Sequence, residues 1–384
     1  MKIDKRNWNT YRFDEFAENI SQRIEPQNTD LSIYVGLEHL DPDSLHIKRH
    51  GSPSDVEGTK LKFYKGDVIF GKRRAYQRKA ALAEYDGICS AHAMVLRAKT
   101  DIIDERLFPF FFHSTIFQTR AIDISVGGLS PTINWKDLAK QEFSLPPKEE
   151  QARLAELLWT ADDVVEREKD VKERTEEYKV LYIENELITN GRCKIRLSEF
   201  GEIIRGVGYK PENLFTHSSD NAFILLRSNN ISNYMVNYDE IQYIDIKLLK
   251  KEQILQNGDI AICMSNGSKE LVGKAGLYTK IKDLPVSIGS FCSIFRPQKD
   301  NYGELVFYLM QSNTYRNQIE RLLSGSNINN LKPSDIAQIT FCIDDENIEK
   351  HIANLKIIND SCRCIINNLK RSQQFKSSLI NQIF

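Results

Sequence analysis

The chain is written in two similar copies. Adding 198 to the numbers of residues 107–162 places Leu107 on Leu305 and Ser114 on Ser312, and no gap is needed to keep the two segments in register. A repeat of this length is much longer than the units of solenoid proteins, so it indicates a duplicated domain. We therefore expect two domains with one shared fold, related by a pseudo-two-fold axis.

The front half of each copy is more variable than the back half. Phe16 corresponds to Phe200 at an offset of 184, and residues 66–70 correspond to 258–262 at an offset of 192. The offset therefore grows between Phe16 and Ala81, and the second copy is the longer one in this region. Because loops absorb length changes more easily than core elements, the front halves are expected to carry the differences between the copies.

Both copies have a mixed pattern of strands and helices. Short β-branched and aromatic runs bounded by turn residues predict strands, and longer periodic runs predict helices at 107–119 and 305–323. The sequence thus predicts an α+β protein with two α/β-like domains whose short strands are mostly antiparallel. The expected strands are Lys65–Phe70, Ala93–Arg97, Asp259–Cys263 and Ser290–Phe295.

A long helix is expected after each domain. Pro146 and Pro147 followed by Glu149 and Glu150 are typical of a helix start, and no Gly or Pro follows before Gly191. Two narrow apolar seams favour an antiparallel coiled coil between the two helices, although each seam could instead pack on its own domain. The predicted seams are 154, 157, 161, 164, 171, 178 and 182 in the first helix, and 352, 355, 359, 362, 366, 369, 373, 376, 380 and 383 in the second.

Length and composition set the broad class. The 384 residues suffice for two to three domains, and 41% apolar with 27% charged residues is typical of a globular protein. The polar start and the absence of an apolar run of about 18–20 residues predict a cytoplasmic protein without a membrane span. Seven scattered cysteines without a CxxC pair predict reduced thiols. The expected segments are domain 1 at 1–147, a helix at 148–190, domain 2 at 191–345 and a helix at 346–384.

The loop Gly71–Lys79 is the strongest signal for nucleic acid. It is rich in Arg and Lys and follows a predicted strand, so its side chains could bind phosphates and read base edges, although a solvated charged face is the simpler alternative. The second copy has a different polar loop, 264–270, in the same place, as recognition of two different sites would require. The candidate DNA-binding residues are Lys72, Arg73, Arg74, Tyr76, Gln77, Arg78, Lys79, Arg205, Tyr209, Lys210, Arg227, Asn229, Asn230, Ser265, Asn266, Ser268, Lys269, Lys274, Asn327 and Asn329.

Catalytic motifs are scarce. The sequence has no P-loop, HExxH, GxSxG or CxxC, and it lacks the Asp/Asn-Pro-Pro-aromatic signature of amino-methyltransferases. A nuclease-like Asp-x-Lys triplet at 245–247 is the kind of match that chance produces in a charged chain. The seven histidines do not pair at metal-ligand spacing. We therefore expect no catalytic residue, metal or cofactor in this chain.

Several segments resemble one known family. Residues 258–262 followed by 273–276, the run 145–151 leading into a long helix, and 375–380 are together similar to the specificity subunit of type I restriction-modification systems. The second copy departs from the pattern, because 343–346 (Ile-Asp-Asp-Glu) replaces the Pro-Pro before its helix.

The resemblance implies a non-catalytic DNA reader. Its two target-recognition domains would each bind half of a split asymmetric DNA site, and its helices would set the spacer and dock two modification subunits. Those partners would hold S-adenosylmethionine and methylate adenine at N6, and restriction subunits would use ATP and Mg²⁺. The alternatives are a coiled-coil scaffold with two protein-binding domains, and a nuclease or methyltransferase with cryptic motifs.

Overall fold

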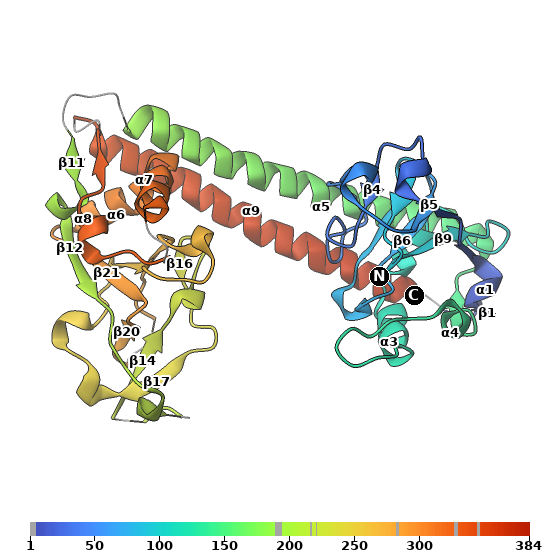
Figure 1. Ribbon diagram of the computed structural model, residues 1–384, viewed down its shortest axis with the longest axis horizontal. Helices are drawn as coiled ribbons and strands as arrows, with labels where there is room; N and C mark the ends of the chain where they lie inside the picture. Colours follow the sequence, from blue (N-terminus) through green and yellow to red (C-terminus); the bar gives the residue numbers. More distant parts are fainter. Residues whose placement is uncertain are drawn as a thin grey trace. The chain divides into compact units, whose positions relative to one another are not determined.

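The computed structural model describes residues 5–188, 194–215, 217–219, 221–281, 284–325, 329–343 and 346–384. The chain divides into two compact units. Unit 1 comprises Met1–Asp170 and Ile366–Phe384, and unit 2 comprises Val171–Ile365. The division falls inside two long helices, α5 (Lys148–Tyr182) and α9 (Ile348–Ile383), so each helix contributes to both units (Figure 1).

Unit 1 is built on two four-stranded sheets, with strand orders β2-β9-β6-β7 and β3-β5-β8-β4. Neighbouring strands are antiparallel except for β4 and β8, which are parallel. A separate pair joins β1 (Asn9–Arg12) to β10 (Glu142–Leu145), the strand that leads into α5. The strands of the two sheets are β2 (Ala17–Ile20), β3 (Arg23–Ile24), β4 (Tyr34–Val35), β5 (Lys60–Phe63), β6 (Val68–Phe70), β7 (Ala80–Leu82), β8 (Gly87–Cys89) and β9 (Met94–Ala98).

An aromatic cluster forms the main core of unit 1. Phe111 packs edge-on against Phe143, with ring centroids 4.8 Å apart and planes at 87°, an arrangement that stabilises beyond the area it buries. Phe384, after the end of α9, packs against the same Phe111 ring at 5.4 Å. The core is thus completed by residues that follow all of unit 2 in the sequence. The short helices of unit 1 are α1 (Phe13–Phe16), α2 (Phe108–Phe111), α3 (Thr115–Asp123) and α4 (Trp135–Leu138).

Unit 2 repeats the first sheet of unit 1 and changes the second. Its larger sheet, β12-β21-β18-β19-β16-β15, contains the counterpart of β2-β9-β6-β7 and two added strands. Its other sheet has the order β13-β17-β14-β20, and a short pair joins β11 to β22. The strands are β11 (Ile195–Arg196), β12 (Gly201–Arg205), β13 (Leu214–Phe215), β14 (Ala222–Leu226), β15 (Ile231–Ser232), β16 (Met235–Val236), β17 (Gln242–Asp245), β18 (Ile260–Cys263), β19 (Ala275–Leu277), β20 (Val286–Ile288), β21 (Cys292–Pro297) and β22 (Thr340–Phe341).

The added strands β15 and β16 explain why the second copy is longer in its front half. They lie between residues 16 and 81 of the first copy's numbering when the repeat is aligned, where the sequence offset grows. The four strands predicted from sequence are confirmed as β6, β9, β18 and β21, with ends that differ by up to three residues. The duplicated fold expected from the repeat is therefore confirmed.

Each predicted helix after the sheets is in fact two helices. The helix predicted at 107–119 is broken into α2 and α3, and the one predicted at 305–323 into α6 (Asp300–Leu309) and α7 (Asn313–Ser324). The break falls where Ser114 and Ser312 cap the second helix of each pair, accepting the amides of residues 117 and 315 at 3.3 and 2.9 Å. A capping serine starts a new helix, and periodicity alone did not reveal it. Unit 2 also contains α8 (Pro333–Ala337).

The predicted seam is confirmed at most of its positions in α9, where Ile366 and Gln373 are nevertheless exposed, and it is partly wrong in α5. In α9 the buried positions include 352, 355, 362, 376, 380 and 383. In α5, Val164, Val171 and Tyr178 are 44%, 49% and 56% exposed, and the buried side chains include Leu158 and Val165. The large apolar residues pointed to the wrong face because buried seam positions of α5 also hold the polar residues 151, 162 and 179.

The two long helices pair in an antiparallel sense within each unit (Figure 1). In unit 1 the first part of α5 packs against the end of α9, where Asp162 binds Lys376. In unit 2 the last part of α5 packs against the start of α9, where the Tyr182 hydroxyl bonds to His351 at 3.0 Å. A π-helical turn, η4 (Ile183–Leu187), follows α5. No helix among the described residues has the length and apolarity needed to cross a membrane.

Candidate nucleic-acid interface

In unit 1 the basic loop after β6 is held against a second loop. The amide of Arg74 donates to the carbonyl of Pro131 at 2.7 Å, and the amide of Ile133 donates to the carbonyl of Lys72 at 3.0 Å. Arg73 forms an isolated antiparallel bridge with Thr132. The two segments, 71–79 and 126–133, therefore form one paired surface, which we call recognition surface 1.

Unit 2 has the same backbone frame at the equivalent positions. The amide of Asn266 lies 3.4 Å from the carbonyl of Asn329, and the amide of Leu331 donates to the carbonyl of Met264 at 2.8 Å. Ser265 forms the isolated bridge to Asn330 that Arg73 forms in unit 1. We call this pair of segments, 264–270 and 329–331, recognition surface 2. The repeat offset thus holds hydrogen bond by hydrogen bond in the loops as well as in the sheets.

The two recognition surfaces differ in their side chains. Arg74 of surface 1 is replaced by Asn266, and Tyr76, which is 53% exposed, is replaced by Ser268. A third position lies in unit 2 just before strand β21, where Phe291 is 69% exposed. Arginine, amide and hydroxyl groups offer different hydrogen-bonding patterns to base edges, so the same frame can read different bases in the two units.

Two of the predicted basic residues are engaged inside unit 1. Arg78 donates to Asp43 at 2.6 Å and to the carbonyl of His113 at 3.1 Å, while the Lys79 ammonium donates to the carbonyl of Leu37 at 2.6 Å. Burial raises the pKa of Asp43, but the neighbouring His113 and the hydrogen-bonded Arg78 outweigh it and lower that pKa to about 2. The Arg78–Asp43 pair therefore stays ionised at neutral pH and holds the loop in place.

The remaining side chains of the basic loop stay accessible. Arg74 is exposed, with its Nε donating to the Ser130 hydroxyl at 3.2 Å. Arg73 is half-buried, and its guanidinium lies 3.4 Å from His92 Nε2. Lys72 and Gln77 are also half-buried. These residues, with Tyr76, are the part of the predicted loop that can meet a partner.

Three segments of unit 2 that contain predicted residues lie together, namely 227–230, 264–270 and 329–331. The Asn266 amide lies 3.4 Å from the Ser228 hydroxyl, so segment 227–230 borders recognition surface 2. Asn229 is exposed there, whereas Asn230 is fully buried and donates to the carbonyl of Asp239 at 2.5 Å. Asn230 shapes this turn and is not available to a partner, which corrects its place among the exposed candidates.

The other candidates lie around this cluster or outside it. The Arg227 guanidinium donates to the carbonyl of Glu240 at 3.2 Å, and the Tyr209 hydroxyl donates to Gln242 at 3.4 Å. Arg205, Lys210 and Lys269 are exposed, and Lys274 is half-buried. Asn327 lies outside the described residues, while Asn329 donates to the carbonyl of Gly267 at 3.2 Å.

Sequence reasoning missed His92 and Phe291. Their backbone carbonyls accept from Arg73 and Ser265, so both belong to the paired surfaces. Leu129, which is 98% exposed in segment 126–133, also lies on recognition surface 1. His92 and Phe291 each lie next to a strand or loop that is repeated in both copies. The register of the duplication was therefore the signal that would have identified them.

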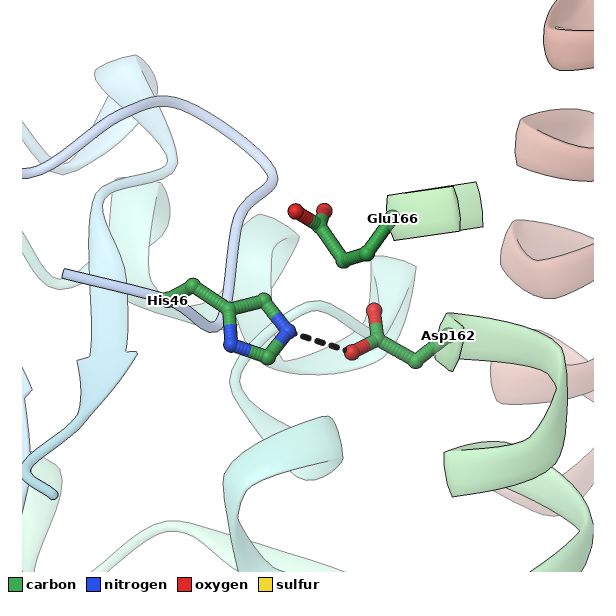
Figure 2. A group of neighbouring side chains, drawn as sticks. All are labelled: His46, Asp162 and Glu166. Atoms are coloured by element: carbon green, nitrogen blue, oxygen red, sulfur yellow. Dashed lines mark hydrogen bonds and ion pairs between the residues drawn. The ribbon is translucent and has the colours of Figure 1, made fainter. Parts of the chain in front are cut away.

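One group of His, Asp and Glu side chains in the described part of the chain is close enough to suggest a metal site. His46, Asp162 and Glu166 face one another in unit 1 (Figure 2). The carboxylate of Asp162 already binds His46 Nε2 at 2.6 Å and the Lys376 ammonium at 2.8 Å. Glu166 binds Lys48 of the loop at 2.8 Å and Lys169 of α5 at 2.6 Å.

The protonation of this group favours a structural role. The hydrogen bond to Asp162 raises the pKa of His46 against the opposing effect of its burial. Burial raises the pKa of Asp162, but His46 and Lys376 outweigh it and lower that pKa. Because a metal ligand histidine must be neutral and the carboxylates already have cationic partners, the group is an ion-pair network that joins the 44–48 loop to α5 and α9.

Residues 6–177 match the family described as the type I restriction modification DNA specificity domain. This chain is therefore similar to that family over the matched residues. The EcoKI specificity subunit of Escherichia coli K12 is 36% identical to it over 143 residues, covering 37% of this chain and 30% of the relative. The chain aligns with about a third of the length of the first curated specificity subunits that it matches.

Solved structures show the same fold across this chain. A structure from work on assembly and conformational transition of the type I R-M system has a TM-score of 0.58 and 17% identity, covering 98% of this chain and 97% of its own. The type I S subunit from M. genitalium has a TM-score of 0.54 and 13% identity, covering 100% and 98%. The tandem architecture with two long helices is therefore that of known type I specificity proteins.

Proposed function

We propose that this chain is the DNA-specificity subunit of a type I restriction-modification enzyme and that each unit reads one half of a bipartite, asymmetric DNA target. The observation that carries the proposal is the pair of recognition surfaces, which share their backbone hydrogen bonds and differ in side chains such as Arg74 and Asn266. A constant frame with different side chains is suited to reading two unrelated half-sites. Contacts from Arg73 would add phosphate binding in unit 1.

The long helices would set the distance between the half-sites. Helix α5 has 35 residues and α9 has 36, which corresponds to about 52–54 Å at 1.5 Å per residue. Half-sites read from one side of a duplex lie about 34–36 Å apart for each helical turn, so rigid helices of this length are suited to fixing a spacer.

Exposed apolar side chains on the helices support docking of partner subunits. In unit 1, Val164 and Phe375 are 44% and 59% exposed and line a mostly apolar groove between α5 and α9. In unit 2, Tyr178 and Leu181 are each 56% exposed. Exposed apolar patches of this kind mark interaction surfaces, and we assign these to two modification subunits.

Catalysis would belong to the partners. The modification subunits would bind S-adenosylmethionine, flip the target adenine out of the duplex and methylate it at N6, while restriction subunits would use ATP and Mg²⁺. This chain would supply the position of the target and take no part in the chemical step.

The test is DNA binding by the purified chain across a salt series. A DNA reader should bind a random-sequence duplex with an affinity that falls steeply as salt rises, because phosphate contacts release counterions. Methylation profiling of host DNA with co-expressed modification subunits should then reveal one bipartite target. A chain that bound no DNA, or that transferred methyl groups or cleaved DNA by itself, would exclude the proposed role.

A further inference from the structure

Unit 1 contains a basic cavity next to recognition surface 1. Its volume is about 340 Å³. Three cationic residues from different elements line it: Arg23 of β3, Lys60 of β5 and Lys72, which begins the loop after β6. Ile133 also lines it, and its amide donates to the carbonyl of Lys72, so the cavity opens beside the paired loops.

The described residues that line the cavity include no carboxylate. Glu25 lies outside the lining and accepts the hydroxyl of Thr59 at 2.5 Å. Among the residues that the structure describes, the side chains of Arg23 and Lys72 make no hydrogen bond or ion pair. Their positive charges are therefore available to a ligand.

Lys60 is held in place and still has donor capacity. Its side chain is buried, and its ammonium donates to the carbonyls of Glu57 and Gly58, the latter at 2.8 Å. An ammonium group has three N–H donors, so one remains for a further acceptor. Asn134 and Ser21 add neutral polar groups to the lining. The arrangement offers several donors to one compact anion.

Electrostatic repulsion within the cluster is not compensated by an acid. Burial lowers the pKa of Lys72, and the nearby Arg23 lowers it further. The pKa of His92 is lowered by burial and then by Arg73, Lys72 and Lys60. Basic groups that destabilise one another in this way are stabilised together when an anion binds among them.

The second unit lacks the cation of Lys72 at the equivalent place. The repeat offset of 192 sets Met264 in the position of Lys72, and Met264 is buried in the core of unit 2. Both residues keep the same backbone bond to the second loop of their surface. The cation at this position is thus a feature of unit 1 and not of the shared backbone frame.

We propose that this cavity seats a phosphate group of the DNA backbone beside the half-site that unit 1 reads, with Arg23, Lys60 and Lys72 as its ligands. The choice of DNA as the source of the phosphate rests on the proposed function. Phosphate contacts set the position of a protein on the duplex without reading its sequence. The site therefore anchors recognition surface 1, while residues such as Arg74 read bases.

The test compares the full-length chain with the variants Arg23→Ala and Lys72→Met in binding a short random-sequence duplex. Methionine is chosen because it is the residue of unit 2 at this position, and the bonded carbonyl of residue 72 is retained. Each variant should bind roughly tenfold more weakly, as expected for loss of a hydrogen bond to a charged group. The slope of log affinity against log salt should become shallower by about one for each contact removed.

Lys140→Ala is the matched control, because Lys140 is an exposed lysine of unit 1 outside the cavity lining. It should leave both affinity and slope close to the wild-type values. Thermal unfolding of all variants checks that the fold is retained, and inorganic phosphate is added in a parallel arm to measure its effect on unfolding temperature.

The outcomes separate the inference from the function on which it rests. Wild-type salt-dependent binding with unchanged Arg23→Ala and Lys72→Met variants would overturn the phosphate seat and leave the DNA-reading role intact. Strong stabilisation by inorganic phosphate, lost in the variants without any change in duplex binding, would assign the cavity to a small free anion and overturn the inference. Absence of duplex binding by the wild type would overturn both.

Discussion

His46 Nε2 and the Asp162 carboxylate lie 2.6 Å apart, and the other oxygen of that carboxylate holds the Lys376 ammonium at 2.8 Å (Figure 2). One buried acid thus joins three segments of unit 1: a loop of the recognition domain, helix α5 and helix α9. Asp162 therefore helps to hold the ends of both long helices against the 44–48 loop of unit 1.

Unit 1 should lose stability as pH rises above 6.5 and through the raised folded-state pKa of His46. His46 faces Asp162, Glu166 and Glu84, and its folded-state pKa lies above the ordinary value of 6.5. A raised folded-state pKa contributes stability that is fully present below 6.5 and is lost as pH rises through the folded value. The three tryptophans, at 8, 135 and 159, all lie in unit 1, so tryptophan fluorescence during heating follows this unit.

We expect His46→Gln to remove this part of the pH dependence, while His50→Gln, which changes an exposed histidine on the same loop, should not. At the acidic end the sign is opposite. The folded-state pKa of Asp162 lies below 3.8, so its contribution is present above 3.8 and is lost as pH falls through the folded value. If His46→Gln and wild type unfolded with the same profile between pH 5 and 9, the imidazole would not be coupled to folding.

Asp162→Asn should destabilise unit 1 by about 3 kcal/mol, because it leaves the buried Lys376 ammonium without its counter-charge. Urea unfolding followed by tryptophan fluorescence measures the effect. Asp163→Asn is the control, since that neighbouring carboxylate is exposed. Adding Lys376→Met to Asp162→Asn should recover part of the loss, and no recovery would argue that the lysine is not the cause.

Arg74→Asn should change the DNA sequence read by unit 1 and leave that of unit 2 unaltered. Arg74 has a positive φ of 58°, a backbone conformation that Asn tolerates well, and Asn266 occupies the equivalent place in unit 2. Loss of a bidentate arginine contact costs about 1–3 kcal/mol of discrimination between bases. Methylation profiling reads both half-sites at once, so the second half-site is the internal control. An unchanged first half-site would remove Arg74 from base recognition.

Adding or removing four residues within 165–180 of α5 should change the spacer of the target and neither half-site. Four residues correspond to about one helical turn, or about 6 Å. The same methylation profile reports spacer length and half-site sequences separately. A change of half-site with a constant spacer would contradict the role of the helix as a ruler.

The sequence allowed the duplicated frame to be predicted because its signals are local and repeated. Nearby residues determine the strand pattern before residue 70 and the proline pair before Lys148. The register that places Ser114 on Ser312 is a signal repeated in the two copies. The seam of α5 was misassigned because Asp162 is buried, and an acid becomes a core residue only through partners such as Lys376 that are remote in sequence.

The recognition residues were less predictable for the same reason. Arg78 and Lys79 look identical to their neighbours in a charge count, yet Asp43 and the Leu37 carbonyl engage them inside the unit. Asn230 looks like a loop amide and is buried. The basic cavity was missed because Arg23 and Lys60 lie on separate strands that only the sheet brings together.

The packing of Phe384 against Phe111 has a consequence for synthesis of the chain. A ribosome makes the sheets of unit 1 first, but residues 366–384 emerge only after all of unit 2 has been translated. The earlier domain must wait, with part of its aromatic core uncovered, until the later one is finished. A truncated translation product would therefore expose this core to the chaperones and proteases of the cell.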